Sequence, residues 1–340
     1  IDSKPLPQLI APDVKGRDFA NWYEEGTSFI GLYGGDWKNR RAEEYIPAAD
    51  RWADTFGYMG GNVLYPTLMI YQFGLSPSDY NIWATRATTD LAEILLLTAE
   101  KYGMKVMFDF HPEARDLRFD PARPNALRSR SGDASTQPPL FGPLHPENRK
   151  WLLGMVREFV NRYSHSPAFK GISIRHMKWC NPALDNFDSL DWGYDDFTAE
   201  LFEKEAGISI PGIRGKDDPD RFARRYEFLT SDRNRGQWIA WRCRKVAELY
   251  RELAEILRQA RPDLVLQCDA FTKEGGVDPA QLVKIDNLVI TSGIDYGRRG
   301  RGETNRLDFL RKMLDPDPDW DMIHFGSAYF EANGLVIPPQ

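Results

Sequence analysis

The alternation of short apolar runs with amphipathic segments is the feature that most constrains the fold of this chain. Such an alternation is typical of a parallel sheet whose strands are joined by helices. Runs of this kind predict seven strands, at Phe29–Tyr33, Asn62–Tyr65, Met104–Phe110, Gly171–Met177, Leu264–Cys268, Leu288–Thr291 and Met322–Phe325. Helical spacing of apolar residues predicts helices between them, at Ala42–Phe56, Asp90–Ala99, Glu147–Tyr163, Asn234–Arg258, Pro279–Lys284 and Asn305–Leu314.

The strand count and the turns after the strands favour a barrel over an open sheet. No Gly-x-Gly-x-x-Gly turn follows any predicted strand, which argues against a doubly wound nucleotide-binding sheet. Barrels of TIM type commonly use about this length as one domain. We therefore predict an α/β protein with one (β/α)8 TIM-type barrel over residues 1–340.

A closed barrel of this type needs an eighth strand, and Gly334–Gln340 does not provide one. We expect either that Leu6–Ile10 helps to close the sheet or that the chain lacks its last strand or a further C-terminal domain.

Two long connections follow predicted strands. Ala114–Pro146 follows the third strand, and the segment from Asn181 to about Thr230 follows the fourth and contains a predicted helix at Tyr194–Ala206. Barrel active sites are built from the loops at the carboxyl ends of the strands. We expect Ala114–Pro146 to lie over the mouth of the barrel.

Charge and hydropathy exclude several classes of partner. The formal net charge is -6 with acidic and basic residues interleaved, so we expect no nucleic-acid partner. The short basic cluster Arg298, Arg299 and Arg301 is interpreted as a solvated loop. The most apolar stretch, around Leu91–Leu97, is far too short to span a membrane.

Cysteine usage and the N-terminus bear on the compartment. The 3 cysteines are too few and too scattered for a disulfide framework or a zinc cluster, so we expect no cofactor. The N-terminus has no basic-then-apolar signal region. We slightly favour a secreted or periplasmic protein whose signal peptide has been removed, and the sequence leaves its oligomeric state open.

Aromatic content points to a ligand class. The chain has 10 Trp, 14 Tyr and 19 Phe, an aromatic share of 13%. Sugars present C–H faces that stack on aromatic rings and hydroxyls that need polar partners, so an aromatic-rich barrel rim suits carbohydrate.

Polar and aromatic side chains gather at the carboxyl ends of the predicted strands, where barrel sites form. The predicted substrate-binding residues are Tyr33, Asp36, Trp37, Tyr65, Asp109, His111, Trp179, Asn181, Asp269, Asp295 and Tyr296. Structural roles stay open for several: Asp36, Asp109 and Asp269 as caps or loop acceptors, and Trp37 and Trp179 as rim cover.

His111 and Glu113 stand two residues apart and could share a metal ion. They supply only two of the three protein ligands that a catalytic zinc site normally uses, so a hydrogen-bonded pair is favoured and no metal is predicted.

One longer motif resembles a known clan. The stretch Trp192-Gly-Tyr-Asp-Asp-Phe-Thr-Ala-Glu-Leu-Phe-Glu-Lys-Glu-Ala-Gly-Ile is similar to the helix after the fourth strand in the (β/α)-barrel glycoside hydrolases that include the β-galactosidases. The resemblance implies a glycosidase whose nucleophile is a glutamate at the end of the seventh strand. Phe330-Glu331-Ala-Asn-Gly falls near that position, which makes Glu331 the candidate nucleophile.

The chain departs from this clan at the acid/base residue. The clan has Asn-Glu after the fourth strand, whereas Trp179-Cys180-Asn181 is followed here by Pro182. Asp185 or Glu113 is the candidate replacement, in a retaining or an inverting mechanism. Two alternatives to a glycosidase stay open, namely a non-catalytic carbohydrate-binding barrel and a metal-dependent barrel hydrolase.

Overall fold

A computed structural model gives the architecture. It describes residues 18–21, 42–58, 61–66, 69–70, 73–74, 76–80, 90–110, 122–135, 141–174, 186–213, 215, 217–269, 273–291 and 322–325. The predicted strand Phe29–Tyr33, the segment Leu6–Ile10 and the predicted helix Asn305–Leu314 lie outside these residues.

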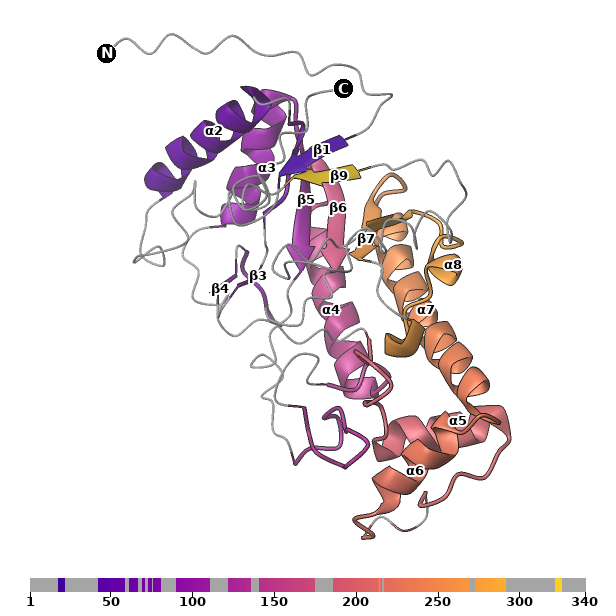
Figure 1. The fold of residues 1–340 in the computed structure, drawn as a ribbon. Coiled ribbons are helices and arrows are strands. Elements are labelled where there is room, and N and C mark those ends of the chain that lie inside the picture. Colours follow the sequence, from indigo (N-terminus) through magenta and orange to yellow (C-terminus); the bar gives the residue numbers. More distant parts are fainter. Residues whose placement is uncertain are drawn as a thin grey trace, which may run out of the picture.

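Seven strands form one sheet in which every pair is parallel. They are β1 (Asp18–Asn21), β2 (Val63–Leu64), β5 (Lys105–Phe110), β6 (Phe169–Ile174), β7 (Val265–Asp269), β8 (Leu288–Thr291) and β9 (Met322–Phe325). The order of the strands in the sheet is β8-β7-β6-β5-β2-β1-β9, so that β9 pairs with β1, beside which it lies in Figure 1. A separate hairpin joins β3 (Met69–Ile70) to β4 (Phe73–Gly74).

Six of the seven predicted strands overlap with β2, β5, β6, β7, β8 and β9, although the bounds differ: β6, predicted at Gly171–Met177, is Phe169–Ile174. Strand β1 was not predicted, because its sequence DFAN contains a single large apolar residue, Phe19. The strand Met322–Phe325 pairs with β1, so the last described strand along the chain lies beside the first.

Helices connect the strands. They are α2 (Ala42–Tyr58), α3 (Leu91–Tyr102), α4 (Pro146–Tyr163), α5 (Asp196–Ala206), α6 (Arg221–Thr230), α7 (Arg235–Ala260) and the short α8 (Pro279–Leu282), with a 3-10 turn η3 at Lys273–Gly275. The Asp90 carboxylate caps α3 by accepting from the Glu93 amide at 3.1 Å, and Gly103 ends it at φ 68°. Helix α6 was not predicted, since its sequence RFARRYEFLT is rich in arginine.

The two faces of the sheet differ in chemistry. Along β5, Val106, Phe108 and Phe110 belong to the large core shared with the helices. Met107 alternates with them and packs instead with Val63, Tyr65 and Val265 in a small separate cluster. Side chains alternate between the faces of a strand, so this cluster lies on the inner face, away from the helices.

A hydrogen bond across the inner face shows that the sheet is strongly curved. Gln267 of β7 donates from Nε2 to the hydroxyl oxygen of Tyr65, directly after β2, at 3.0 Å. Strands β5 and β6 lie between β2 and β7, which would put these strands roughly 14 Å apart in a flat sheet. Side chains stand nearly perpendicular to a sheet, so the two meet only because the sheet curls around them.

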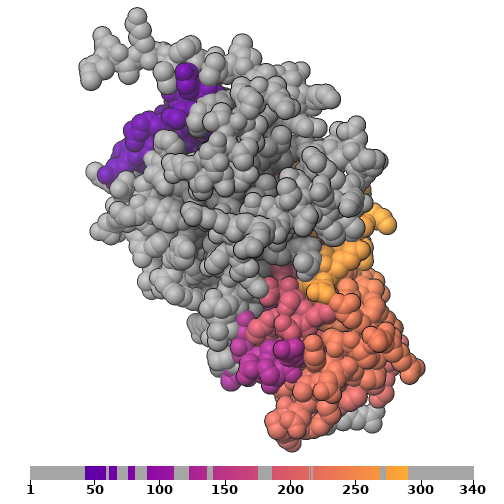
Figure 2. Space-filling model, in the orientation of Figure 1, coloured from indigo at the N-terminus to yellow at the C-terminus, as the bar shows by residue number. Residues whose placement is uncertain are grey.

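The two long connections pack together into a lobe, which consists of residues 122–135 and 141–145, residues 186–213, and helix α6. The amides of Gly193 and Tyr194 donate to the Arg128 carbonyl at 3.0 and 3.2 Å, and the Arg130 amide donates to the Asp191 carbonyl at 2.8 Å. The lobe lies at the starts of α4 and α7, on the side where β5 and β6 end (Figure 1). Figure 2 shows its two segments side by side at one end of the molecule.

The described part of Ala114–Pro146 therefore lies on the side of the sheet that was expected. Leu127, Phe141 and Leu144 of this segment belong to the same continuous apolar cluster as Phe108 and Leu266 of the sheet. This continuity is consistent with one domain over residues 1–340, which stays a prediction.

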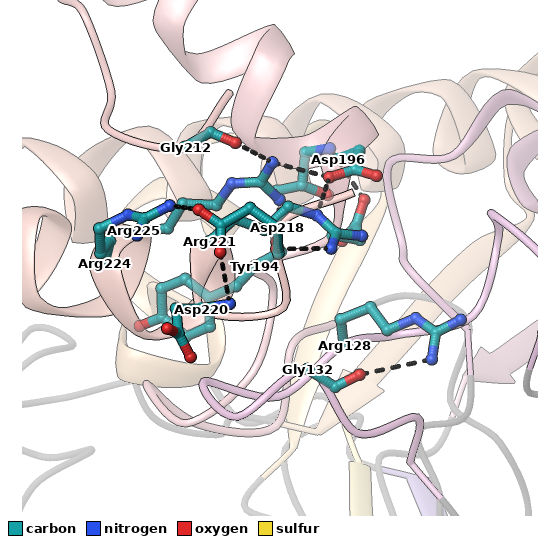
Figure 3. A network of polar contacts seen from close by, with 12 residues as sticks. Arg128, Gly132, Tyr194, Asp196, Gly212, Asp218, Asp220, Arg221, Arg224 and Arg225 are labelled. Atoms are coloured by element: carbon teal, nitrogen blue, oxygen red, sulfur yellow. Dashed lines mark hydrogen bonds and ion pairs between the residues drawn. The ribbon is translucent and has the colours of Figure 1, made fainter. Parts of the chain in front are cut away.

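Two adjacent aspartates of the lobe have opposite electrostatic environments. Asp195 is fully buried and caps α5 by accepting from the Thr198 amide at 2.8 Å. Its other oxygen, Oδ2, has no hydrogen-bond partner in the described part of the chain, and burial raises the pKa of this carboxyl. Asp196 accepts from Arg221 at 3.1 Å and pairs with the buried Arg225 at 2.7 Å, as Figure 3 shows. Burial alone would raise the pKa of Asp196, but the two guanidinium groups outweigh it and lower that pKa.

Replacing each aspartate by asparagine is expected to change stability in opposite directions at neutral pH. Asp195→Asn keeps the helix cap and removes a buried charge, so it should stabilise by about 1 kcal/mol at pH 7. That gain should vanish near pH 3, because a carboxyl with a raised pKa costs stability only as the pH rises above its unfolded value of about 3.9.

Asp196→Asn should lower the free energy of unfolding at pH 7 and have little effect on it in acid. The reason is that a carboxyl with a lowered pKa contributes stability that is lost as the pH falls below about 4. Urea unfolding of both variants from pH 3 to pH 8 tests this. Parallel stability curves for the two variants would contradict the assignment.

Candidate functional site

A layer of buried polar side chains lies on the inner face of the sheet. Strand pairing places Asp109 of β5 opposite Ser173 of β6, and Ser173 opposite Gln267 of β7. These three residues and Tyr65 are each at most 1% exposed. We refer to Tyr65, Asp109, Ser173 and Gln267 as the inner polar layer.

The layer sits near the carboxyl edge of the sheet. Asp109 is the penultimate residue of β5, and its amide donates to the Pro66 carbonyl at 2.9 Å. Val63, Met107 and Val265 fill the inner face beside it with apolar side chains. The inner face of the curved sheet is thus apolar at Val63, Met107 and Val265 and polar nearer the carboxyl ends of the strands. Parallel α/β proteins bind ligands at this carboxyl edge.

The hydrogen-bonding of the layer is specific where the structure describes it. The Tyr65–Gln267 bond crosses the inner face, and the Ser173 hydroxyl has no hydrogen-bond partner in the described part of the chain. The layer offers hydroxyl, amide and carboxylate groups, which are the groups that bind sugar hydroxyls.

The structure brings two predicted substrate-binding residues together, namely Tyr65 and Asp109. Asp109 lies within β5, and its role in binding substrate stays a prediction. Asp269 is the last residue of β7 and pairs with Thr291 at the same edge.

The other predicted site residues lie outside the described residues. They are Glu331, Glu113, Asp185, Tyr33, Asp36, Trp37, His111, Trp179, Asn181, Asp295 and Tyr296. Within the described ranges, no three His, Cys, Asp or Glu side chains gather to hold a metal ion.

Two members of the layer were not predicted, Ser173 and Gln267. Each is a polar residue between two apolar neighbours of a buried strand, in GISI and LVLQC. Strict attention to alternation would have found them, because the positions next to Ile172, Ile174, Leu266 and Cys268 face away from the helices.

Comparisons place the fold among known structures. No protein-family model matches the sequence, and no curated protein matches it. The chain is similar to the PgaB (BpsB) glycoside hydrolase domain from Bordetella bronchiseptica, with a TM-score of 0.56 at 12% identity over 87% of this chain and 79% of that one. The catalytic domain of a β-amylase from Paenibacillus polymyxa gives a TM-score of 0.57 at 9% identity, over 95% and 89%.

A third similar structure is a GH42 β-galactosidase from G. stearothermophilus, with a TM-score of 0.52 at 10% identity over 89% of this chain. The chain spans 44% of that protein's length. These likenesses and the parallel sheet show the (β/α)-barrel fold of glycoside hydrolases. None of the helices in the described ranges is long and apolar enough to cross a membrane.

Proposed function

We propose that the protein is a glycoside hydrolase that cleaves an oligosaccharide or polysaccharide at the carboxyl face of its barrel. The observation that carries the proposal is the inner polar layer, in which the buried Asp109 carboxylate and three neutral hydrogen-bonding groups lie near the carboxyl edge. In a glycosidase fold, this is the place where a sugar ring would enter.

The proposed catalytic groups are carboxyls from the loops above the layer. In a retaining mechanism Glu331 attacks the anomeric carbon, whereas in an inverting mechanism it takes a proton from the water that attacks this carbon. In both, Glu113 or Asp185 gives a proton to the leaving oxygen. A retaining enzyme needs its two carboxyls ~5 Å apart, and an inverting enzyme holds them ~6.5 to 9.5 Å apart with a water between them. The loss of the clan's acid/base glutamate at Pro182 favours the inverting arrangement, which tolerates a displaced acid more easily.

Aromatic and polar residues of the rim would hold the sugar. We assign the stacking platform to Tyr33, Trp37, Trp179 and Tyr296, and sugar-hydroxyl binding to Tyr65, Asp109 and the polar residues at the other strand ends. Tyr65, Asp109 and Asp269 are the members that lie within the described residues.

A panel assay tests the proposal. The purified protein is incubated with aryl glycosides and with plant, algal and bacterial polysaccharides, with and without a chelator. Release of sugar that survives chelation supports the proposal, and release abolished by chelation supports a metal-dependent hydrolase.

A second candidate, a non-catalytic carbohydrate-binding barrel, is favoured by Pro182 at the position of the clan's catalytic glutamate. Binding of a polysaccharide without release of any product would support this candidate and overturn the first.

A further inference from the structure

We propose that a small monovalent anion of the halide class binds beside the guanidinium of Arg242, in the interior of the protein where α7 packs on the lobe. This site shares no residue with the inner polar layer, so its occupancy does not depend on the proposed function.

Arg242 lies near the start of α7, and none of its surface is exposed. The lobe holds its guanidinium: Nη2 donates to the Ser189 carbonyl oxygen at 2.8 Å, and Cζ lies 4.2 Å from the centre of the Phe187 ring. The ring of Trp238, about one turn earlier on α7, has its centre 5.4 Å from the same carbon. A carbonyl and two aromatic rings thus fix the place of this cation.

Three hydrogens of the guanidinium have no acceptor. Nε carries one and Nη1 carries two, and neither nitrogen makes a hydrogen bond in the described part of the chain. The buried indole nitrogen of Trp238 makes none there either. Buried donors in native proteins are nearly always satisfied, by protein groups or by a bound water or ion. Donors of two contacting side chains therefore indicate a bound acceptor.

The charge of Arg242 indicates which acceptor fits. Arginine is almost never fully buried without a paired charge, yet Arg242 makes no ion pair with the described residues. Asp195 and Glu274 act on it electrostatically. Glu274, however, pairs with Arg235, and burial raises the pKa of Asp195, which favours its uncharged form. Burial lowers the pKa of Arg242 to about 10, so this side chain is still charged at neutral pH.

An anion supplies both the acceptor and the missing negative charge, whereas a water molecule supplies only the acceptor. The anion is small because the guanidinium is enclosed, and it is monovalent because it faces one cation. Chloride meets both conditions and is the probe for the first experiment.

The first experiment measures stability against chloride. Urea unfolding is followed in increasing potassium chloride, with potassium gluconate keeping the ionic strength constant. An ion that binds only the folded state raises the folding equilibrium constant about tenfold for each tenfold rise in its concentration above its Kd. We expect this dependence in wild type and its loss in Arg242→Met. Arg251→Met, which removes an exposed guanidinium from the same helix, is the matched control and should keep it.

The second experiment locates the ion and needs no variant. Crystals of the wild-type protein are soaked in bromide, and anomalous scattering should place an ion at hydrogen-bonding distance from Nε or Nη1 of Arg242. Bromide at the protein surface alone, as an adventitious ion only, would overturn the proposal. So would a wild-type stability that does not respond to chloride, or an equal response in a folded Arg242→Met protein.

Discussion

Glu331→Gln is expected to lower turnover by on the order of 10³-fold or more while sugar binding stays nearly unchanged. Glutamine keeps the size and hydrogen bonding of the side chain but can neither attack an anomeric carbon nor stabilise its developing positive charge. The measurement is kcat on the best substrate of the panel, beside calorimetric binding of the same sugar to the variant.

A control variant and a melting curve distinguish a catalytic role of Glu331 from a structural one. Glu252→Gln removes a carboxylate from the exposed part of α7, where Glu252 pairs with Arg149 at 2.6 Å, and should leave turnover unchanged. If Glu331 only anchors its loop, Glu331→Gln should lower the melting temperature and spare activity. Unchanged turnover in a folded Glu331→Gln protein would end the nucleophile assignment.

The strands were predictable because parallel strands are buried on both faces and so read as nearly continuous apolar runs. MKVMFDF and LVLQC illustrate this at β5 and β7. Strand β1 was not predicted because DFAN has no such apolar run. Its position is defined by its pairing with β2 and β9. Non-local pairing of this kind leaves no local mark in a sequence.

Helix ends were predictable where a cap is chemically explicit. Asp90 before α3 and the glycines Gly103 and Gly207 after α3 and α5 mark ends that the structure has. Helix α6 lacks a side-chain cap bond at its start, and one of its three buried residues is Arg225, a residue type that sequence patterns assign to the surface.

The candidate site was predictable only in part. Tyr65 and Asp109 were found because they stand at or near strand ends, where barrel sites are built. Ser173 and Gln267 join them through the register of three strands, and the Tyr65–Gln267 bond depends on the curvature of the whole sheet. Curvature of a sheet arises from the packing of several strands together, so no single segment of the sequence predicts it.

The pairing of β6 with β7, which aligns Ser173 with Gln267, depends on a glycine at position 171. Replacing this glycine is expected to destabilise the protein severely. Gly171 of β6 lies opposite Val265 of β7 with φ 154°, and an added Cβ would fall 1.9 Å from the Val265 carbonyl oxygen. That oxygen belongs to the backbone of a paired strand, so it cannot move aside as a flexible side chain would. Gly171→Ala must therefore push β6 and β7 apart.

We expect Gly171→Ala to cost about 3 kcal/mol or more, the upper range for overpacking a core, and to lower the melting temperature or prevent folding. Gly236→Ala is the matched control, because a Cβ at this position of α7 meets nothing within 4 Å and alanine favours a helix. That variant should be as stable as wild type or slightly more so.

Thermal and urea unfolding of the two variants decide the matter. Because β6 and β7 also carry Ser173 and Gln267 side by side, a Gly171→Ala protein that still folds should lose sugar binding along with stability. A melting temperature equal to that of wild type would mean that β6 and β7 do not approach so closely at Gly171, and the alignment of the inner polar layer would then need another cause.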